Sequence, residues 1–333
     1  MKKTISTLIF FLFFLISLSF AQVKLIFDTD MGGDADDLGA LAMLHNLKDA
    51  GECKVLAIML WSNEKYAVPA VNAVNIFYGN PDIPIGVRDK EAPMDDDWRY
   101  NKPLAKALPY ELTNQDVPLA VDLYRKTLSQ QEDSSVVIVT VGPLKNIKDL
   151  LLSHPDEYSE LTGQELVEQK VKKFVIMGGK FPEGEWEWNF SGFMEGVSIF
   201  VLENLRVPIV FSGYELGYQI RTGPKLQKLG PDHPLYIGYK HFSKHAPWMV
   251  EYYEEGKITP NATYDQTAVL FAVRGGLGKY WEKVENGYCI PDETGGNIWK
   301  TVDDRPTNHA YLKLIKPPEE MAEIIYAIML NEM

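Results

Sequence analysis

The sequence predicts an α/β fold with a single open, mostly parallel sheet flanked by helices. Short apolar runs alternate with longer segments of helical periodicity from residue 23 onward, as in successive βα units. Most of these runs contain few polar residues, which is typical of strands covered by helices on both faces. No repeat or low-complexity linker interrupts the chain, so we expect residues 22–333 to form one domain.

The expected elements follow from these two patterns in chain order. The apolar runs predict strands at residues 23–29, 54–60, 136–141, 174–177 and 207–211. The periodic segments predict helices at residues 36–48, 66–78, 116–128, 143–152, 195–204 and 265–273. A last helix, ending near Leu330, begins with prolines and acids that favour a helix start. Residues 86–113 and 180–196 fit neither pattern and predict long loops, which often carry functional residues.

The charge balance limits the classes of ligand. The chain has 33 Lys and Arg against 46 Asp and Glu, a net charge of −13. This argues against non-specific binding to nucleic acid or anionic lipid, and favours a cation or a neutral small molecule. Cys53 and Cys289 are too few for a disulfide scaffold and lack zinc-motif spacing, although one bridge between them stays open.

The amino terminus has the features of a signal peptide over residues 1–21. Two lysines precede a run of 13 almost wholly apolar residues, 8–20, and the small residues Ser19 and Ala21 predict cleavage before Gln22. The run is shorter than the roughly 20 residues of a spanning helix, and no later segment is long and apolar enough. We therefore expect an exported protein, periplasmic or secreted, with no membrane span after signal removal.

Five aspartates crowd the turn between the first expected strand and helix. They are Asp28, Asp30, Asp34, Asp36 and Asp37. Two of them would be ordinary at a helix start, but five would repel one another unless a hard cation binds, and oxygen-only ligands suit Ca²⁺ or Mg²⁺. Open α/β sheets bind ligands at the carboxyl ends of their strands, where this turn lies. The sequence therefore predicts a metal site here.

Other proteins with acidic or glycine-rich turns fit less well. An EF-hand loop starting at Asp28 would require Glu at its twelfth position, which is Gly39. Phosphate loops and dinucleotide fingerprints have glycines without this negative charge. Phosphatases of the haloacid dehalogenase type also place Asp-x-Asp after a strand, with Asp28 as nucleophile. Gly32 stands at the fifth position, where that motif has Thr or Val, so the phosphatase remains a weaker alternative.

Four further segments follow the acidic turn in chain order. They are VGPLKN at 141–146, VIMGG at 175–179, EWNF at 187–190 and YDQTAV at 264–269. Together with DTDMG and DDLGAL within 28–41, these segments resemble the inosine-uridine-preferring nucleoside hydrolase family. The resemblance extends from residue 23 to about residue 274. It implies a calcium-dependent N-ribohydrolase on a single α/β domain.

The resemblance also implies a ligand set for calcium. Asp30, Asp37 and Asp265 would bind the ion through carboxylates, and Val141 through its backbone carbonyl. Asp34 lies within two residues that are inserted relative to the family, and it is a candidate for an additional ligand. Asp30 would also take the proton of the attacking water. Such an ion would orient the water and make it easier to deprotonate, while carboxylates stabilise positive charge on the ribose.

The implied substrate contacts divide into a sugar side and a base side. The residues implied on the sugar side are Asp36, Asn63, Met177, Glu187 and Asn189. Trp188, in an acidic loop, is a candidate for stacking on the base. Tyr264 stands where the family has His, and its phenol can donate a hydrogen bond to the departing base although its usual pKa of about 10 makes it a poor proton shuttle.

These features favour calcium-dependent hydrolysis of the N-glycosidic bond of a ribonucleoside or related riboside. Two alternatives remain: an exported calcium-dependent protein that binds ribose or a nucleoside without turnover, and the phosphatase. The expected partner is a small-molecule riboside rather than a nucleic acid, and a homo-oligomer is compatible with the sequence.

Overall fold

The computed structural model describes residues 22–89, 98–302 and 306–333. Its centre is an eight-stranded sheet in which every neighbouring pair is parallel except β10 with β13. In spatial order its strands are β10 (Trp281–Val284), β13 (His309–Leu314), β7 (Ile209–Ser212), β5 (Val171–Met177), β4 (Val136–Thr140), β1 (Val23–Thr29), β2 (Cys53–Leu60) and β3 (Ile85–Val87). The predicted open, mostly parallel sheet is confirmed. The predicted signal peptide lies outside the described residues.

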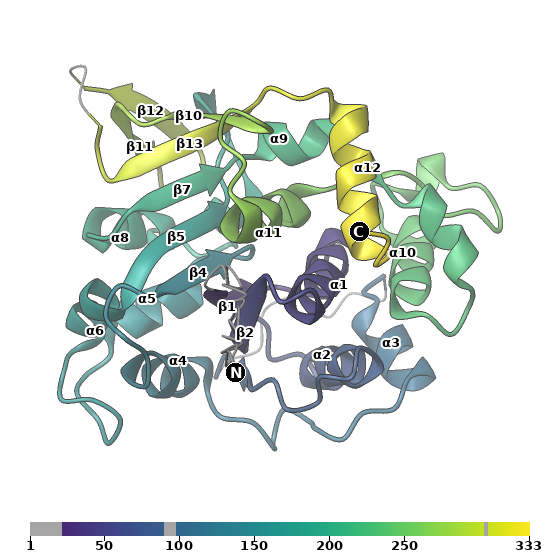
Figure 1. The fold of residues 1–333 in the computed structure, drawn as a ribbon, viewed down its shortest axis with the longest axis horizontal. Coiled ribbons are helices and arrows are strands. Elements are labelled where there is room, and N and C mark those ends of the chain that lie inside the picture. The colour runs from purple at the N-terminus through teal and green to yellow at the C-terminus, as the bar shows by residue number, and fades with distance from the viewer. Residues whose placement is uncertain (1–21, 90–97, 303–305) are drawn as a thin grey trace, which may run out of the picture.

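Helices cover both faces of this sheet, as Figure 1 shows. Alternate residues of β1 point to opposite sides, so that Leu25 and Phe27 belong to one hydrophobic cluster and Ile26 to the other. The first cluster includes residues of α1 (Asp36–Asp49), α2 (Ala67–Phe77), α3 (Asn101–Ala107), α9 (Tyr214–Gln219), α10 (Pro234–His245), α11 (Tyr264–Arg274) and α12 (Pro318–Met329). The second includes residues of α4 (Ala120–Ser129), α5 (Lys145–Leu152), α6 (Gly163–Lys170), α7 (Trp188–Ser191) and α8 (Val197–Asn204).

Smaller elements lie beside this framework. One small sheet has the order β11 (Gly287–Pro291), β12 (Asn297–Thr301) and β6 (Glu183–Gly184), and another pairs β8 (Arg221–Thr222) with β9 (Asn261–Ala262). Short 3₁₀ helices occupy Pro224–Leu229 and Val250–Tyr252. Among the described residues, no helix is both long and apolar enough to cross a membrane.

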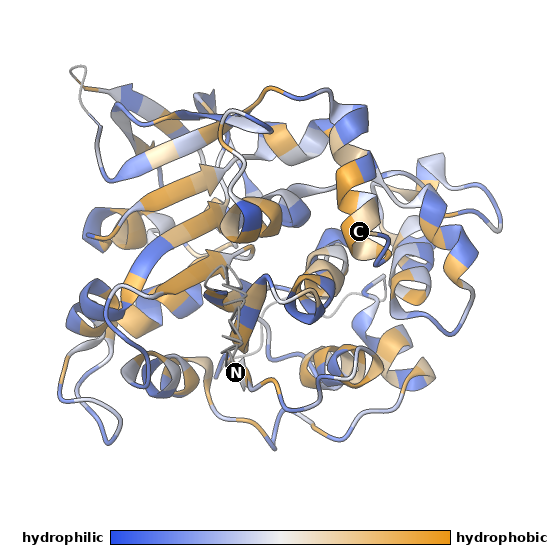
Figure 2. Cartoon of the chain, in the orientation of Figure 1, coloured by the Kyte–Doolittle hydropathy of each residue, from blue (hydrophilic) through white to orange (hydrophobic). Residues whose placement is uncertain are grey.

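The predicted strands are all present, but the sheet has three more. Figure 2 shows the central strands β4 and β7 as predominantly hydrophobic, which is why the sequence revealed them. β10 lies at the sheet edge and contains exposed Glu282 and Lys283, while β13 ends in exposed or half-exposed residues. Such mixed patterns lack the continuous apolar run of a central strand. β3 has only three residues, too few to show a pattern.

The two predicted long loops contain regular structure. α3 lies within 86–113, and β6 and α7 lie within 180–196, so the prediction of structureless loops was wrong there. α6 was also missed, although Thr162 and Glu165 form a capping box at its start. α8 begins at Val197 instead of residue 195. These helices are short, between four and eight residues, and short helices depend on tertiary packing.

The register of the sheet places the ends of its central strands at one edge. Asp28 of β1 pairs with Thr140 of β4, and Thr140 pairs with Ile176 of β5. The residues that follow these strands therefore meet at the same edge, where open α/β sheets bind ligands.

Candidate functional site

A cavity of about 610 Å³ opens at the carboxyl edge of the central strands. Its lining residues include Asp30, Asp34, Asp36, Asp37, Val141, Met177, Glu187, Trp188, Asn189, Tyr264 and Asp265. All of these are residues that the sequence proposed as site residues. The other lining residues are Gly33, Trp98, Lys180, Trp186, Phe193, Tyr214 and Trp248.

Three buried carboxylates form the tightest group in this cavity. Oxygen atoms of Asp36, Asp37 and Asp265 lie within 4.8 Å of one another. Asp36 and Asp37 begin α1, and Asp265 lies in the first turn of α11. The backbone N–H of Asp265 donates to Oδ2 of Asp36 at 3.3 Å, and the hydroxyl of Thr29 donates to Oδ1 of Asp37. Two helix starts, distant in sequence, thus hold these oxygens together.

The electrostatics of this group favour a bound cation. Burial raises the pKa of Asp36, Asp37 and Asp265 well above the usual range, and the neighbouring carboxylates raise it further by repulsion. A divalent cation would remove this repulsion. The donor set is oxygen only, which fits a hard cation such as Ca²⁺ or Mg²⁺. The residues present are therefore suited to hold a metal ion.

Two predicted metal ligands make other contacts in the same cavity. Oδ2 of Asp30 accepts a hydrogen bond from Nε1 of Trp188 at 2.7 Å. Oδ1 of Asp34 accepts one from Nδ2 of Asn261 at 2.5 Å, and burial raises the pKa of Asp34 to about 6. The structure instead groups Asp36, expected on the sugar side, with Asp37 and Asp265.

Asn189 links the ends of two central strands. Its Nδ2 donates to the carbonyl oxygen of Val141 at 3.0 Å and to that of Met177 at 3.1 Å. Its Oδ1 is buried and has no hydrogen-bond partner within the part of the chain that the structure describes. The amide is held by its nitrogen, so the oxygen remains available to accept a hydrogen bond from a ligand hydroxyl.

Glu187 organises the turn that carries Asn189. Its carboxylate accepts backbone hydrogen bonds from Gly179 at 2.9 Å, from Asn189 at 3.0 Å and from Phe190 at 3.1 Å, and so caps α7. Burial raises its pKa to about 7, although these hydrogen bonds act in the opposite direction. Glu187 therefore positions the loop as well as lining the cavity.

Two residues that the sequence analysis considered for the site, Asn63 and Asp28, do not line the cavity. Asn63 is not among the lining residues; its Oδ1 accepts a hydrogen bond from Asn114 at 2.6 Å. Asp28, the nucleophile of the phosphatase alternative, has no exposed surface and accepts hydrogen bonds from Tyr124 at 2.7 Å and Asn146 at 3.3 Å. A nucleophile must reach its substrate, so the position of Asp28 argues against a phosphatase.

An aromatic wall also lines the cavity. We use this name for the seven aromatic residues that line the cavity, Trp98, Trp186, Trp188, Phe193, Tyr214, Trp248 and Tyr264. Trp98 packs edge-to-face on Trp248 at 5.0 Å, and Trp188 on Phe193 at 5.3 Å. The sequence proposed Trp188 and Tyr264 as site residues, and Trp186 and Trp248 were further candidates for stacking on the base, but it did not propose Trp98, Phe193 or Tyr214. The positions of Trp98 and Phe193 in the two predicted functional loops were the available signal.

Tyr264, the predicted hydrogen-bond donor to the base, is the first residue of α11 and lines the cavity. Its ring stacks on that of Tyr214 at 5.1 Å between centroids. Burial raises the pKa of Tyr264, and a side-chain hydrogen bond with Tyr214 raises it further. The phenol therefore stays protonated at neutral pH and can act only as a hydrogen-bond donor or acceptor.

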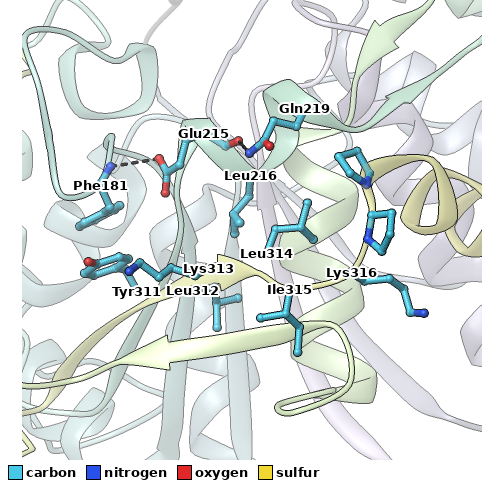
Figure 3. Close-up of a pocket in the computed structure, with 12 residues that line it drawn as sticks. Phe181, Glu215, Leu216, Gln219, Tyr311, Leu312, Lys313, Leu314, Ile315 and Lys316 are labelled. Atoms are coloured by element: carbon cyan, nitrogen blue, oxygen red, sulfur yellow. Dashed lines mark hydrogen bonds between the residues drawn. The ribbon is translucent and has the colours of Figure 1, made fainter.

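Glu215 and the two cysteines lie outside this cavity. Glu215 lines a second cavity of about 500 Å³, beside Phe181 and Lys313 (Figure 3), and accepts a hydrogen bond from the backbone N–H of Phe181 at 3.0 Å. The two described cysteines, Cys53 and Cys289, are buried and unbonded to each other.

An open parallel sheet with a carboxylate-lined cavity at its carboxyl edge defines an α/β protein with a candidate metal-dependent active site. Residues 25–316 match the family model described as "Inosine-uridine preferring nucleoside hydrolase". The chain therefore belongs to this family. The resemblance inferred from the six sequence segments is confirmed.

Individual relatives add detail. The chain is 30% identical over 102 residues to a pyrimidine-specific ribonucleoside hydrolase, RihA, of Escherichia coli O1:K1. That alignment covers 30% of this chain and only 29% of the relative. Among solved structures, a plant nucleoside hydrolase, PpNRh1, has a TM-score of 0.64 at 18% identity and covers 92% of this chain and 98% of its own. An inosine-guanosine nucleoside hydrolase covers the same shares, with a TM-score of 0.60 at 18% identity. These structures show that the fold is shared.

Proposed function

We propose that this protein hydrolyses the N-glycosidic bond of a ribonucleoside or related riboside, with Ca²⁺ as its cofactor. The observation that carries the proposal is one cavity lined both by the Asp36, Asp37 and Asp265 carboxylates and by Asn189, whose amide oxygen has no partner within the described chain. Membership of the nucleoside hydrolase family supports the reaction class.

The oxygen donors have complementary tasks in this proposal. Asp36, Asp37 and Asp265 would hold the ion, with Asp30 and the carbonyl of Val141 nearby in the same cavity. When bound, a divalent cation supplies positive charge that makes water easier to deprotonate and fixes a vicinal diol. The oxygen of Asn189 accepts a hydrogen bond from a ribose hydroxyl, which orients the sugar.

Asp30 is the proposed proton acceptor. Burial raises its pKa above the usual range, while the hydrogen bond from Trp188 and the positive charge of Arg99 act to lower it. These opposing influences keep a carboxylate available while making it more basic than an exposed Asp. The carboxylates also stabilise the positive charge that develops on the ribose as the bond breaks.

The departing base would lie against the aromatic wall. Tyr264 is the proposed hydrogen-bond donor to it, since the pKa of its phenol is raised and the proton is retained. Tyr214 stacks on Tyr264 and holds its ring in place. Trp188 and Phe193 offer further ring surface.

The test is a substrate panel with the purified protein, residues 22–333. Inosine, uridine, adenosine and a nitrophenyl riboside are incubated with Ca²⁺ or with a chelator, and released ribose is measured. We expect turnover that requires the ion. If only the nitrophenyl riboside is hydrolysed, the protein binds and activates the sugar but does not assist the departure of an ordinary base. Tight binding of all compounds with no turnover would overturn the proposal in favour of a binding protein.

We also propose that the protein is exported. The basic start, the apolar run of residues 8–20 and the small residues before Gln22 support a cleaved signal peptide. Sequencing the amino terminus of protein from the medium and from cell fractions tests this. A mature chain that begins at Gln22 is expected, and a cytosolic protein that keeps residues 1–21 would contradict the proposal.

A further inference from the structure

Arg99 is a buried arginine at the edge of the cavity that the reaction scheme above does not use as a ligand contact. It precedes Tyr100, the residue that caps α3, and its side chain is only 6% exposed. The guanidinium carbon lies 5.3 Å from the centroid of the Trp98 ring. Nη2 lies 3.9 Å from the position that a β-carbon on Gly33 would occupy. Trp98 and Gly33 both line the cavity, so the guanidinium lies beside two lining residues although Arg99 is not one of them.

None of the three guanidinium nitrogens has a hydrogen-bond partner among the described residues. Nε, Nη1 and Nη2 of Arg99 are all buried and unsatisfied. A guanidinium has five N–H donors, and burying a charged group without partners is strongly unfavourable. A native protein retains such a group where a ligand or another function compensates for it.

Arg125 shows how this fold satisfies a guanidinium that has no ligand role. It is 2% exposed, and its Nε donates to Asp156 at 2.6 Å and its Nη1 to Ser153 at 3.0 Å. Its Nη2 donates to Asp156 and to two backbone carbonyls at 2.9–3.1 Å. The contrast between Arg125 and Arg99 indicates that the partner of Arg99 lies outside the part of the chain that the structure describes.

The neighbouring acids do not replace that partner. The charge of Arg99 lowers the pKa of Asp30, so the two groups attract each other through space. Oδ2 of Asp30 is nevertheless directed to the indole N–H of Trp188. Long-range attraction does not satisfy N–H donors, which need an acceptor in the plane of the guanidinium.

Gly33 is a cavity residue beside Arg99. It lies in the acidic turn, and it has no side chain to occupy the space between the turn and the guanidinium. A β-carbon there would contact Nη2 at 3.9 Å and the carbonyl oxygen of Asp30 at 4.0 Å, which are ordinary van der Waals distances. Alanine is therefore tolerated at this position, and it would narrow the approach to the guanidinium.

We propose that Arg99 binds an oxyanion carried by the riboside, so that the cavity selects ribosides with a carboxylate or phosphate group. This inference rests on the proposed function and names its substrate class. Planar, bidentate recognition of carboxylate and phosphate is the usual task of arginine. The oxyanion is either a carboxylate on the base or a phosphate on the sugar.

A matched series of uridine, orotidine and uridine 5′-phosphate tests the proposal and separates the two sources. The three compounds share a pyrimidine and a ribose, and differ by a carboxylate on the base or a phosphate on the sugar. We expect wild type with Ca²⁺ to have a kcat/KM for one charged compound that exceeds that for uridine by roughly 10- to 100-fold, because a site built to hydrogen-bond a group rejects the analogue that lacks it.

Substitutions at and near Arg99 test whether this preference depends on the guanidinium. Arg99→Gln should abolish this preference, taken as the ratio of kcat/KM for the charged compound to kcat/KM for uridine, because the ratio cancels any effect of Arg99 on Asp30 that both substrates share. Gly33→Ala should reduce the ratio, because it restricts the contact with the oxyanion. Arg99→Lys, which keeps the charge but not the fork, should fall between Gln and wild type. Arg206→Gln removes an exposed arginine bonded to the carbonyl of Glu203 and should leave the preference unchanged.

The outcomes distinguish this inference from the proposed function. Preference for orotidine identifies a base carboxylate, and preference for uridine 5′-phosphate identifies a sugar phosphate. Equal rates for all three compounds, unaffected by Arg99→Gln, would overturn the inference and leave the hydrolase intact. If no compound is hydrolysed, the proposed function fails, and calorimetric titration of each compound still tests Arg99: binding of a charged compound that Arg99→Gln weakens supports it, and equal binding overturns it.

Discussion

The cavity has two unlike sides, an acidic side built mostly from one turn and an aromatic wall built from several separate segments. Four of the cavity's acids, Asp30, Asp34, Asp36 and Asp37, lie within eight residues of the chain. The aromatic wall gathers residues from 98 to 264. The acids are mostly buried, whereas Phe193 is 73% exposed and Trp248 49%. The acidic side thus provides fixed chemistry, and the aromatic wall offers an accessible surface that discriminates between leaving groups.

Removing a central carboxylate should have the largest effect. Asp37→Asn should lower kcat/KM by on the order of 10³-fold or more, since a cation contributes several kcal/mol to stabilising the transition state. The same substitution should abolish tight Ca²⁺ binding in calorimetry and the rise in melting temperature that Ca²⁺ produces. Asp82→Asn, at an exposed position, is the matched control. Unchanged calcium affinity in Asp37→Asn would contradict the assignment of the site.

Substitutions in the aromatic wall should lower activity less than loss of a carboxylate, and the largest of these losses is expected at Tyr264. Tyr264→Phe should slow hydrolysis of an ordinary nucleoside by about 10²-fold and hardly affect a nitrophenyl riboside, whose leaving group needs no hydrogen-bond donor. Tyr214→Phe keeps the ring stack and removes only the neighbouring hydroxyl, so it should have a smaller effect. Equal losses on both substrates in Tyr264→Phe would show that another group assists the departing base.

Trp188 belongs to the aromatic wall and also contacts Asp30 on the acidic side, and its substitution should have a smaller effect than that of Tyr264. Trp188→Phe keeps an aromatic ring but removes the indole N–H that holds Asp30 at 2.7 Å. We expect kcat/KM to fall by roughly 10-fold, about the value of one charge-assisted hydrogen bond. Trp186→Phe, in the same loop and 47% exposed, should change the rate less. Equal effects of the two substitutions would indicate that only ring packing matters.

The smallest expected effect is a pH dependence of stability. Burial raises the pKa of Glu187 to about 7 on the acidic side, and that of Glu215 to about 7 in the second cavity. An acid whose pKa is raised by folding takes up a proton more readily in the folded state. The free energy of unfolding of metal-free protein should therefore increase as the pH falls from 8 to 6.5.

Melting curves in the presence of a chelator measure this dependence. We expect an increase of a few degrees over that range, at about 2–4 °C per kcal/mol for domains of 150–250 residues. Glu187→Gln together with Glu215→Gln should reduce it, and Asp28, whose pKa burial also raises to about 7, should keep part of it. Below pH 6.5 the trend should weaken, since burial lowers the pKa of His45, His233 and His309 to about 4 and opposes their protonation in the folded state. A melting temperature that falls between pH 8 and 6.5 would contradict the prediction.

A similar difference separates the parts of the fold that the sequence predicts from those that it does not. The central strands and most long helices follow from periodicity, because buried strands need continuous apolar runs and helices a regular apolar face. β10, with exposed Glu282 and Lys283, and the seven-residue α3 carry weak local patterns. Their conformations depend on packing against neighbours that no short window of sequence contains.

The sequence by itself determined the acidic turn, because five aspartates between one strand and one helix lie together whatever the remaining chain does. The meeting of Asp265 with Asp36 depends on how α11 packs against α1, 229 positions away in the chain. The same holds for the contact of Trp98 with Trp248 and for the burial of Arg99 beside Gly33. Contacts of this kind are formed only when the whole sheet and its helices assemble, so only the tertiary structure decided what the carboxylates face.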